Sequence, residues 1–558
     1  MNPSQKTVDN CVKVSELRQS YCAPERVDAV AGGYMVTFPQ AGFGRLEVVL
    51  TSRQGGEEVE VEFAEKLDAS GEVDRSPAGC IRYRKSMLTL NAGTHRYKVK
   101  IRPDKRNTLP QAIHMPPEIG EVLPFRYVRL NGCPQAPGVD DLRQVMVHVP
   151  WDEGASSFSS SSTVLNQVWS LCKHSIKATS FAGIYVDGDR ERIPYEGDAY
   201  INQLCHYAVD AAPAIARRSL RYLLQHPTWP TEWVLHFNFM AWADYMQSGD
   251  LVFLAEHYET LKDRSLYFMD RGDGLVETDE PTLDQFTRVG LSQPFKDLVD
   301  WPPASFTEGG YGEDDGYDKT CKCNTVVNAF CFQNYKLLFK MATVLGLEEE
   351  AATWRARVEK VRETFQLVFF DEERGLYRDG EGGSHCAQHA NFFPLCFGLV
   401  PAEAQATVTA FVIEKGMSCS VYGAQYLLES LYKMRKADDA LALMEAKHDR
   451  SWWNMIQVGS TITLEAWDWK YKNNLDWNHA WGAAPLNIIP RYLFGIRPVE
   501  AGWGKIIHDP QPGGLDWARL VLPTPRGEIR AEFSRDEKGN VIHRIDLPDG
   551  VELVRSAN

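Results

Sequence analysis

The chain has 558 residues, of which 44% are hydrophobic and 24% are charged, as expected for a globular protein of several domains. Its formal net charge is −15, and an acidic surface repels phosphate, so we expect no nucleic-acid partner. It contains no apolar run of about 18 residues, so we expect no membrane span.

The cysteines and the first residues bear on cellular location. Twelve cysteines lie at uneven spacings, which is typical of free thiols in a reducing compartment. The first residues lack the apolar core of a signal peptide, so we expect a cytoplasmic protein. Cys321, Cys323 and Cys331 lack the paired spacing of a zinc site. We therefore expect no metal and no cofactor, and the oligomeric state stays open.

Short runs of alternating, β-branched and aromatic residues occupy the first part of the chain. Glycine, aspartate and proline separate them, which predicts an N-terminal β-sandwich over residues 1–155. The Ser-rich run "ASSFSSSST" (155–163) follows, either as a flexible linker or, as we favour, ending in the N-cap of the next helix. The strand-like runs are "YMVTF", "RLEVVLTS", "EVEVEFA", "HRYKVKIR" and "FRYVRLNG".

From there to residue 496 the apolar period is that of a helix. Leu165, Val168, Trp169 and Ile176 share one helical face, and Trp354 begins a similar pattern. Many helices without strong strands between them predict an all-α domain over 156–496, built from helix pairs as a solenoid or a closed toroid. No fixed-length repeat is visible, which disfavours a regular solenoid. Further helices are predicted near 212–225, 232–247, 251–268, 324–344, 402–415, 420–434 and 478–494.

Two other segments interrupt or follow this helical region. Strand-like runs return after Pro498 and predict a small C-terminal β-domain over 497–558. A long polar loop follows Val299, and loops of this length inside compact domains are usually functional or disordered. Its aromatic content favours a functional role. The loop carries Trp301, Glu308, Glu313, Asp314, Asp315 and Asp318.

Two clusters of acidic residues are candidates for catalysis. The bent run "YVDGDRERIPYEGDAYINQL" (185–204) contains Glu191 and Asp198, which either stabilise the start of a helix or form part of a site. Far downstream, Glu465 lies among tryptophans in "TLEAWDWKYKNNLDWNHAWG", where burial would raise its pKa and suit proton transfer. Two carboxylates meeting at the mouth of a helical barrel would suit glycosidic bond cleavage. The alternative is a non-catalytic carbohydrate-binding protein.

At these residues the chain resembles the α-L-rhamnosidases of glycoside hydrolase family 78. The run "DGDRERIPYEGDA" keeps Arg190, Glu191, Arg192 and Asp198 in step with the family's signature, and "WNHAWG" and "RYLFGIRP" follow its C-terminal half. The resemblance covers nearly the whole chain from about residue 35. It implies an (α/α)6 barrel between two β-domains, and a hydrolase that removes a terminal deoxysugar or a related sugar.

The resemblance also implies roles for individual residues. Glu191 would be the general acid and Glu465 the base of an inverting mechanism, with their carboxyl groups about 6.5–9.5 Å apart. Three departures are the missing Cys-Pro, the Pro194 that replaces a glycine, and Glu196, which we expect to add a carboxylate at the rim. The expected sugar-binding residues are Asp187, Arg190, Tyr195, Asp198, Trp233, Trp301 and His479.

Overall fold

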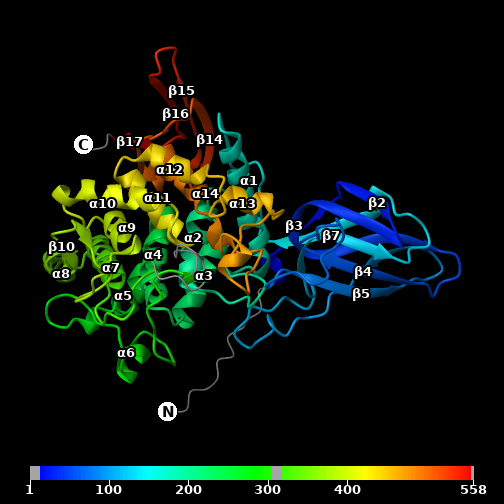
Figure 1. The fold of residues 1–558 in the computed structure, drawn as a ribbon, viewed down its shortest axis with the longest axis horizontal. Coiled ribbons are helices and arrows are strands. Elements are labelled where there is room, and N and C mark those ends of the chain that lie inside the picture. The colour runs from blue at the N-terminus through cyan, green and yellow to red at the C-terminus, as the bar shows by residue number, and fades with distance from the viewer. Residues whose placement is uncertain (1–12, 304–315, 555–558) are drawn as a thin grey trace.

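The computed structural model describes residues 13–303 and 316–554, and Figure 1 shows their arrangement. The N-terminal strands project from one side of a helical domain, and the C-terminal strands β14 to β16 lie on another side of it. Glu308, Glu313, Asp314 and Asp315 of the predicted functional loop lie outside the described residues.

The N-terminal strands form one sheet, in which both halves of the long strand β3 are paired. The sequence separates "YMVTF" from "RLEVVLTS", but both belong to β3. Pro39 lies between them and has no N–H for the ladder, and the pairing with β7 shifts register between Thr37 and Gly42. The first half of β3 pairs with β2 and β7 and the second half with β6 and β8, and the sheet encloses the main apolar core of this domain. The strands are β1 (Arg18–Cys22), β2 (Arg26–Val30), β3 (Gly33–Ser52), β4 (Glu58–Ala64), β5 (Tyr83–Thr89), β6 (Gly93–Lys98), β7 (Leu123–Asn131) and β8 (Leu142–His148).

Six inner helices form a closed ring, because each one contacts the next and the last contacts the first. The predicted toroid is therefore correct, and the open solenoid is not. The inner helices are α2 (Glu196–Tyr207), α4 (Thr231–Ser248), α7 (Thr325–Val344), α9 (His389–Phe397), α11 (Gly423–Lys433) and α14 (Pro485–Ile488).

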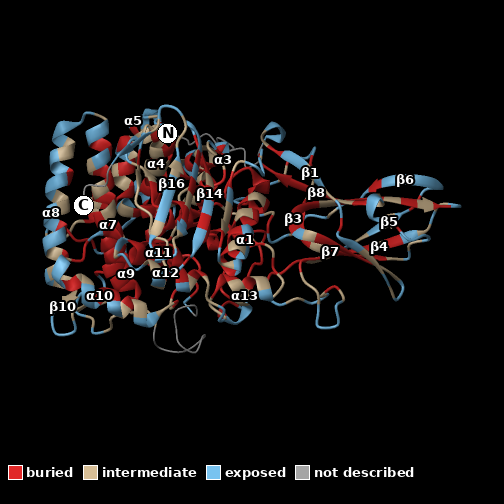
Figure 2. Ribbon diagram, turned by 90° about the horizontal axis from the view of Figure 1, so that it is seen from above, coloured by how far each residue is buried: buried red, intermediate tan, exposed pale blue. Residues whose placement is uncertain are grey.

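An outer layer of helices surrounds this ring. Figure 2 shows that the outer helix α8 exposes one side to solvent, whereas α9 of the inner ring is buried along its length. The outer helices are α1 (Thr163–Thr179), α3 (Ala214–Gln225), α5 (Val252–Arg264), α8 (Glu348–Phe369), α10 (Ala402–Lys415), α12 (Ala437–Met444) and α13 (Trp452–Gln457), with the short α6 (Leu283–Arg288) between α5 and α7.

Most predicted helices are present, but one of them is broken, and the observed helices α6, α9, α12 and α13 were not predicted. The predicted helix over 478–494 is divided into the short 3-10 turn η7 (Ala480–Gly482), α14 and the π-helical segment η8 (Ile489–Leu493), because Pro485 and Pro490 cannot donate backbone hydrogen bonds. Helix α9 was not predicted, because every one of its residues is buried and no polar face alternates with an apolar one.

The Ser-rich run has two roles, one of them predicted. Ser162 caps α1 as expected, since its hydroxyl accepts a hydrogen bond from the Leu165 N–H at 3.2 Å. The residues just before it form strand β9 (Ser157–Ser160), which pairs with β14 near the other end of the chain. The run is therefore not a flexible linker, and it joins the start of the barrel to the C-terminal strands.

The C-terminal strands form two small sheets, ordered β16-β15-β14-β9 and β12-β13-β17. The described cysteines are free thiols. None of the described helices combines the length and the apolar composition needed to cross a bilayer. The remaining strands are β10 (Phe370–Asp371), β11 (Leu376–Tyr377), β12 (Ile496–Pro498), β13 (Lys505–His508), β14 (Trp517–Thr524), β15 (Gly527–Arg535), β16 (Val541–Asp546) and β17 (Glu552–Val554).

Candidate active site

Two irregular segments meet at the amino-terminal ends of the inner helices. Residues 183–195 lead into α2, and residues 460–482 lead into α14. They are more than 250 residues apart in the chain, yet Arg190 and Glu465 are in direct contact, at a separation of 275 residues. The closed ring brings its first and last inner helices together, and so brings these two segments together.

A single guanidinium group connects the two candidate catalytic acids. Arg190 places Nε 3.3 Å from Glu191 Oε1, and its Nη1 lies 3.1 and 2.8 Å from the two carboxylate oxygens of Glu465. The Tyr195 hydroxyl donates to Glu191 Oε2 at 3.2 Å. The Glu191 side chain is 34% exposed, whereas that of Glu465 is 2% exposed. One acid thus faces solvent and the other is enclosed.

The enclosed carboxylate of Glu465 is surrounded by positive charge. Burial acts to raise its pKa, but Arg190, His479 and Lys472 outweigh burial and hold the pKa below the ordinary value for glutamate. Lys472 Nζ lies 3.3 Å from Glu465 Oε1, and the Asp476 N–H donates to Oε2 at 3.1 Å. The expectation of a raised pKa is therefore wrong. The raised pKa was inferred from the tryptophans near Glu465 in the sequence. Arg190, which lowers the pKa, is distant in the sequence and was not considered.

Asp198 and His479 form a pair beside these acids. Asp198 lies in the first turn of α2, and its Oδ1 is 2.5 Å from His479 Nε2. The other ring nitrogen of His479 is buried and has no hydrogen-bond partner among the described residues. The Trp481 ring packs 4.7 Å from that of His479, and its indole N–H donates to the Glu465 carbonyl at 3.1 Å.

The predicted aromatic residues also lie at this end of the barrel. Trp233 is 3% exposed and packs 6.4 Å from Trp481 between ring centroids. Trp301 is half-buried, with Lys472 Nζ 5.8 Å from its ring centroid. A methyl group added at Gly197 would lie 2.8 Å from the Trp233 ring, so only glycine lets this ring lie against α2.

Asp187 and Asp476 each leave one carboxylate oxygen buried and without a partner among the described residues. Asp187 accepts the Ile193 N–H at 2.9 Å, and burial, with the nearby Glu191, raises its pKa well above the usual value. Asp476 accepts the Arg190 N–H at 3.2 Å, and burial raises its pKa to about 6. Asp476 was not predicted as a site residue from the sequence. Its position in "DWNHAWG", three residues before His479, is the signal that could have found it.

Glu196 does not add a carboxylate to the rim of the site. It is fully buried, accepts the Thr228 N–H at 3.1 Å and lies 3.5 Å from Arg264. Successive residues of an α-helix point about 100° apart, so Glu196 and Asp198 point in nearly opposite directions from α2. The extra acid is part of an internal ion pair.

The N-terminal domain holds the segment that carries Glu191. Asp189 is fully buried and pairs with Arg82 of that domain and with Arg192, whose Nη2 is 2.7 Å away. Asn107 donates to the Asp189 carbonyl at 3.0 Å. Arg192 has φ 56°, a left-handed conformation that non-glycine residues rarely adopt. Contacts between domains therefore define the bend.

Replacing Asp189 with asparagine should destabilise the protein strongly. The substitution removes the charge shared by two buried guanidinium groups, those of Arg82 and Arg192. Removing one partner of a buried ion pair costs about 3–5 kcal/mol of unfolding free energy when the other charge is left unpaired. Arg82 and Arg192 each keep one carboxylate partner, Asp104 and Glu121, so we expect a loss toward the lower end of this range. We expect a lower urea midpoint. The unfolding transition of the N-terminal domain is measured separately from that of the helical domain, because a chain of several domains need not unfold in one step.

An exposed ion pair of the N-terminal domain provides the control. Lys85 and Glu60 lie 3.0 Å apart with the lysine side chain 63% exposed, so Glu60→Gln should change the unfolding free energy by less than about 1 kcal/mol. An Asp189→Asn variant as stable as Glu60→Gln would contradict the proposed role of Arg82 in holding the segment.

Within residues 13–303 and 316–554, one group of donors is close enough together to be considered for a metal ion. Atoms of Glu465, Asp476 and His479 lie within 4.8 Å of one another. The Glu465 oxygens already contact Arg190 and Lys472, so a divalent ion would have to displace or face two cationic side chains. The donor set fits a network of carboxylates and cationic side chains better than a metal centre.

Comparison with known proteins agrees with this architecture. Residues 153–493 match the family model of the bacterial alpha-L-rhamnosidase six-hairpin glycosidase domain, and residues 495–554 match that of the bacterial alpha-L-rhamnosidase C-terminal domain. A curated alpha-L-rhamnosidase of Formosa agariphila is 22% identical over an alignment of 475 positions, which covers 77% of this chain and 46% of that protein. A second from the same organism is 24% identical, and the matched region is 45% of its length. The chain thus spans less than half the length of these curated relatives.

Two solved structures share the fold. The alpha-L-rhamnosidase of Dictyoglumus thermophilum superposes with a TM-score of 0.77 at 21% identity, covering 96% of this chain and 58% of that one. The alpha-L-rhamnosidase of Streptomyces avermitilis, complexed with L-rhamnose, superposes with a TM-score of 0.74 at 19% identity, covering 96% of this chain and 50% of that one. Because its inner helices close into a ring and residues 153–493 match the family model, the chain belongs to the bacterial alpha-L-rhamnosidase six-hairpin glycosidase family.

Proposed function

We propose that the protein is an inverting α-L-rhamnosidase, or a close relative that removes a terminal deoxysugar from a glycoside. The observation that carries this proposal is the contact of Arg190 with both Glu191 and Glu465, one carboxylate partly open to solvent and the other enclosed among cations. This asymmetry gives two acids two different roles, as glycoside cleavage requires.

The reaction needs one proton donor and one proton acceptor. Glu191, hydrogen-bonded to Tyr195, donates its proton to the leaving oxygen as the glycosidic bond breaks. Glu465 is held ionised by its lowered pKa and takes a proton from a water molecule, which attacks the anomeric carbon from the opposite face. Arg190 contacts both carboxylates and fixes their relative position. The released sugar then has the inverted anomeric configuration.

Buried polar atoms without hydrogen-bond partners bind the hydroxyl groups of the sugar. Among the described residues, Asp187 and Asp476 each have a free carboxylate oxygen, and His479 has a free ring nitrogen. Unpaired buried polar groups are costly, so a sugar that supplies hydroxyl partners gains binding energy from them. Trp233 and Trp301 provide an apolar side for the methyl group of a 6-deoxysugar. The similarity to alpha-L-rhamnosidases, one of them complexed with L-rhamnose, supports rhamnose as this sugar.

A panel of aryl glycosides tests the proposal directly. We expect the highest kcat/KM on an aryl α-L-rhamnoside, and lower values on the β-L-arabinoside, α-L-fucoside and β-D-glucuronide. Release of the aryl alcohol is followed by absorbance for each substrate. Preference for another glycoside would mean that the proposed sugar specificity is wrong, while the proposed mechanism would still hold. Binding of rhamnose without hydrolysis of any member would instead support a carbohydrate-binding protein.

Removing the charge of Lys472 should move the acidic limb of the pH profile. Lys472 lowers the pKa of Glu465, so Lys472→Met raises that pKa, and the base becomes protonated at a higher pH as the solution is acidified. We expect the acidic limb of kcat/KM to move upward by about one pH unit. Lys470→Met is the matched control, since Lys470 is half-exposed and pairs with Asp449 instead. An equal shift in both variants would contradict the assignment of Glu465 as the base.

A further inference from the structure

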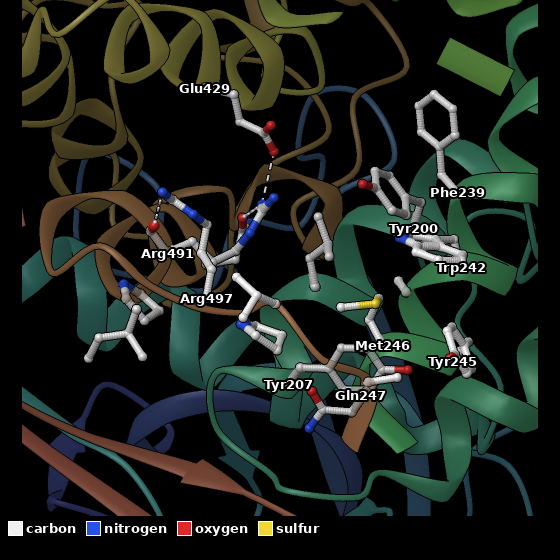
Figure 3. Close-up of a pocket in the computed structure, with 18 of the residues that line it drawn as sticks. Tyr200, Tyr207, Phe239, Trp242, Tyr245, Met246, Gln247, Glu429, Arg491 and Arg497 are labelled. Atoms are coloured by element: carbon white, nitrogen blue, oxygen red, sulfur yellow. Dashed lines mark hydrogen bonds and ion pairs between the residues drawn. The ribbon is translucent and has the colours of Figure 1, made fainter. Parts of the chain in front are cut away.

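A second cavity lies at the opposite end of the barrel from the candidate active site. It has a volume of about 810 Å³ and is surrounded by the carboxyl-terminal parts of α2, α4, α7 and α11, with η8 and β12 (Figure 3). Asp198 and Tyr207 mark the two ends of α2, about 14 Å apart along its axis. The volume lies in the range of small-molecule sites, about 300–1,000 Å³. We call this cavity the second pocket.

One wall of the second pocket is aromatic. Figure 3 shows Tyr200, Phe239, Trp242 and Tyr245 together on one side. The ring centroids of Tyr200 and Phe239 are 5.4 Å apart, and those of Trp242 and Tyr245 are 5.2 Å apart. Tyr200, Trp242 and Tyr245 are only half-buried, so parts of these rings remain open to a ligand. Such a wall binds a flat ring by stacking or edge contacts.

The carboxylates at the second pocket already have cationic partners. Glu429 lies 2.9 Å from Arg491 Nη1 and 3.1 Å from Lys433 Nζ. Glu500 pairs with Lys505 at 3.4 Å. Figure 3 places Glu429 and Arg491 across the cavity from the aromatic wall. These pairs neutralise both acidic residues among those described around the cavity.

Two further cationic residues at the second pocket form no direct ion pair with a carboxylate among the described residues. Lys340 contacts the Trp242 ring, with Nζ 5.7 Å from its centroid, and partial desolvation and the neighbouring Lys433 lower its pKa. Arg497 donates to a backbone carbonyl, that of Arg491, at 2.7 Å. The cavity therefore has an excess of positive charge, although the whole chain carries −15. An anion would be attracted by this excess of positive charge.

A third feature indicates a hydroxyl group on the ligand. Gln333 lines the second pocket from α7, and its side-chain oxygen is buried without a hydrogen-bond partner among the described residues. A buried acceptor of this kind is costly unless a donor reaches it. Gln333 lies two helical turns before Lys340 on α7, so a hydroxyl and an anionic group at opposite ends of one ring system would reach both.

We propose that the second pocket binds a flat aromatic carboxylate that carries a hydroxyl group at its far end. The ring system lies against Trp242 and its neighbours, the carboxylate faces Lys340 and Arg497, and the hydroxyl donates to Gln333. This binding does not depend on the proposed hydrolysis, because the second pocket and the catalytic carboxylates lie at opposite ends of the inner helices.

Titration calorimetry on the full chain tests the proposal, with 6-hydroxy-2-naphthoate as the probe and 2-naphthol as its analogue without the carboxylate. We expect one probe molecule to bind per chain, at least about tenfold more tightly than 2-naphthol, because only the probe meets the unpaired cations. Galacturonate is the third ligand, since it carries the anion on a non-aromatic ring. Equal affinities for probe and 2-naphthol, tighter binding of galacturonate, or no probe binding at millimolar concentration would overturn the proposal.

Two variants test whether the probe binds in the second pocket. Lys340→Gln and Trp242→Leu should each weaken probe binding by about tenfold or more and leave glycoside hydrolysis unchanged. The matched controls are Lys85→Gln and Trp517→Leu, which change exposed residues of the same kinds away from the cavity. Lys340 is exposed, so its variant should fold normally even if Trp242→Leu does not. Unchanged binding in Lys340→Gln, or an equal loss in the controls, would contradict the placement.

Discussion

Replacing Glu465 with glutamine should lower kcat/KM by about 10²–10⁴-fold on activated and unactivated substrates alike. The substitution keeps the shape of the side chain but removes the base that takes the proton from water. Both kinds of substrate need that step, so the leaving group should make no difference. Rates of hydrolysis of an aryl rhamnoside and of an alkyl rhamnoside are compared in the wild type and the variant.

Glu191→Gln should instead lower the rates on the same two substrates to different extents. An activated aryl leaving group needs little protonation, so its rate should fall much less than that of the alkyl rhamnoside, for which we expect a loss of about 10²–10⁴-fold. Glu153→Gln serves as the control, because Glu153 is 65% exposed and pairs with Lys177 at the surface. This variant should hydrolyse both substrates at the wild-type rate.

Proton NMR of the first turnover determines the stereochemistry of the reaction, on which the interpretation of both glutamine variants depends. The inverting mechanism predicts that the first sugar released has the opposite anomeric configuration to the substrate. Retention of configuration, or full activity in both glutamine variants, would contradict the roles given to Glu191 and Glu465. It would leave a retaining enzyme with another nucleophile, or a sugar-binding protein.

Local patterns in the sequence determined much of the fold. The helical periodicity from Leu165 onward predicted α1, and the run of serines predicted the cap at Ser162. These features depend on neighbours within about one turn, so a single sequence contains them. The run "DGDRERIPYEGDA" similarly indicated Glu191 and Asp198 as site residues, because its charge and its bends are local. Helix α9 escaped this reasoning since burial on all sides removes the periodic signal.

Only the tertiary structure decided the chemical state of the site. The pKa of Glu465 lies below its ordinary value because of Arg190, which is 275 residues away in the chain, and no local pattern connects the two. The same holds for Arg82, which reaches Asp189 across 107 residues. Electrostatic interactions act through space, and the closure of the helical ring brings Arg190 and Glu465 together. The sequence therefore indicates which acids are present, and the fold determines the direction in which the pKa of Glu465 is shifted.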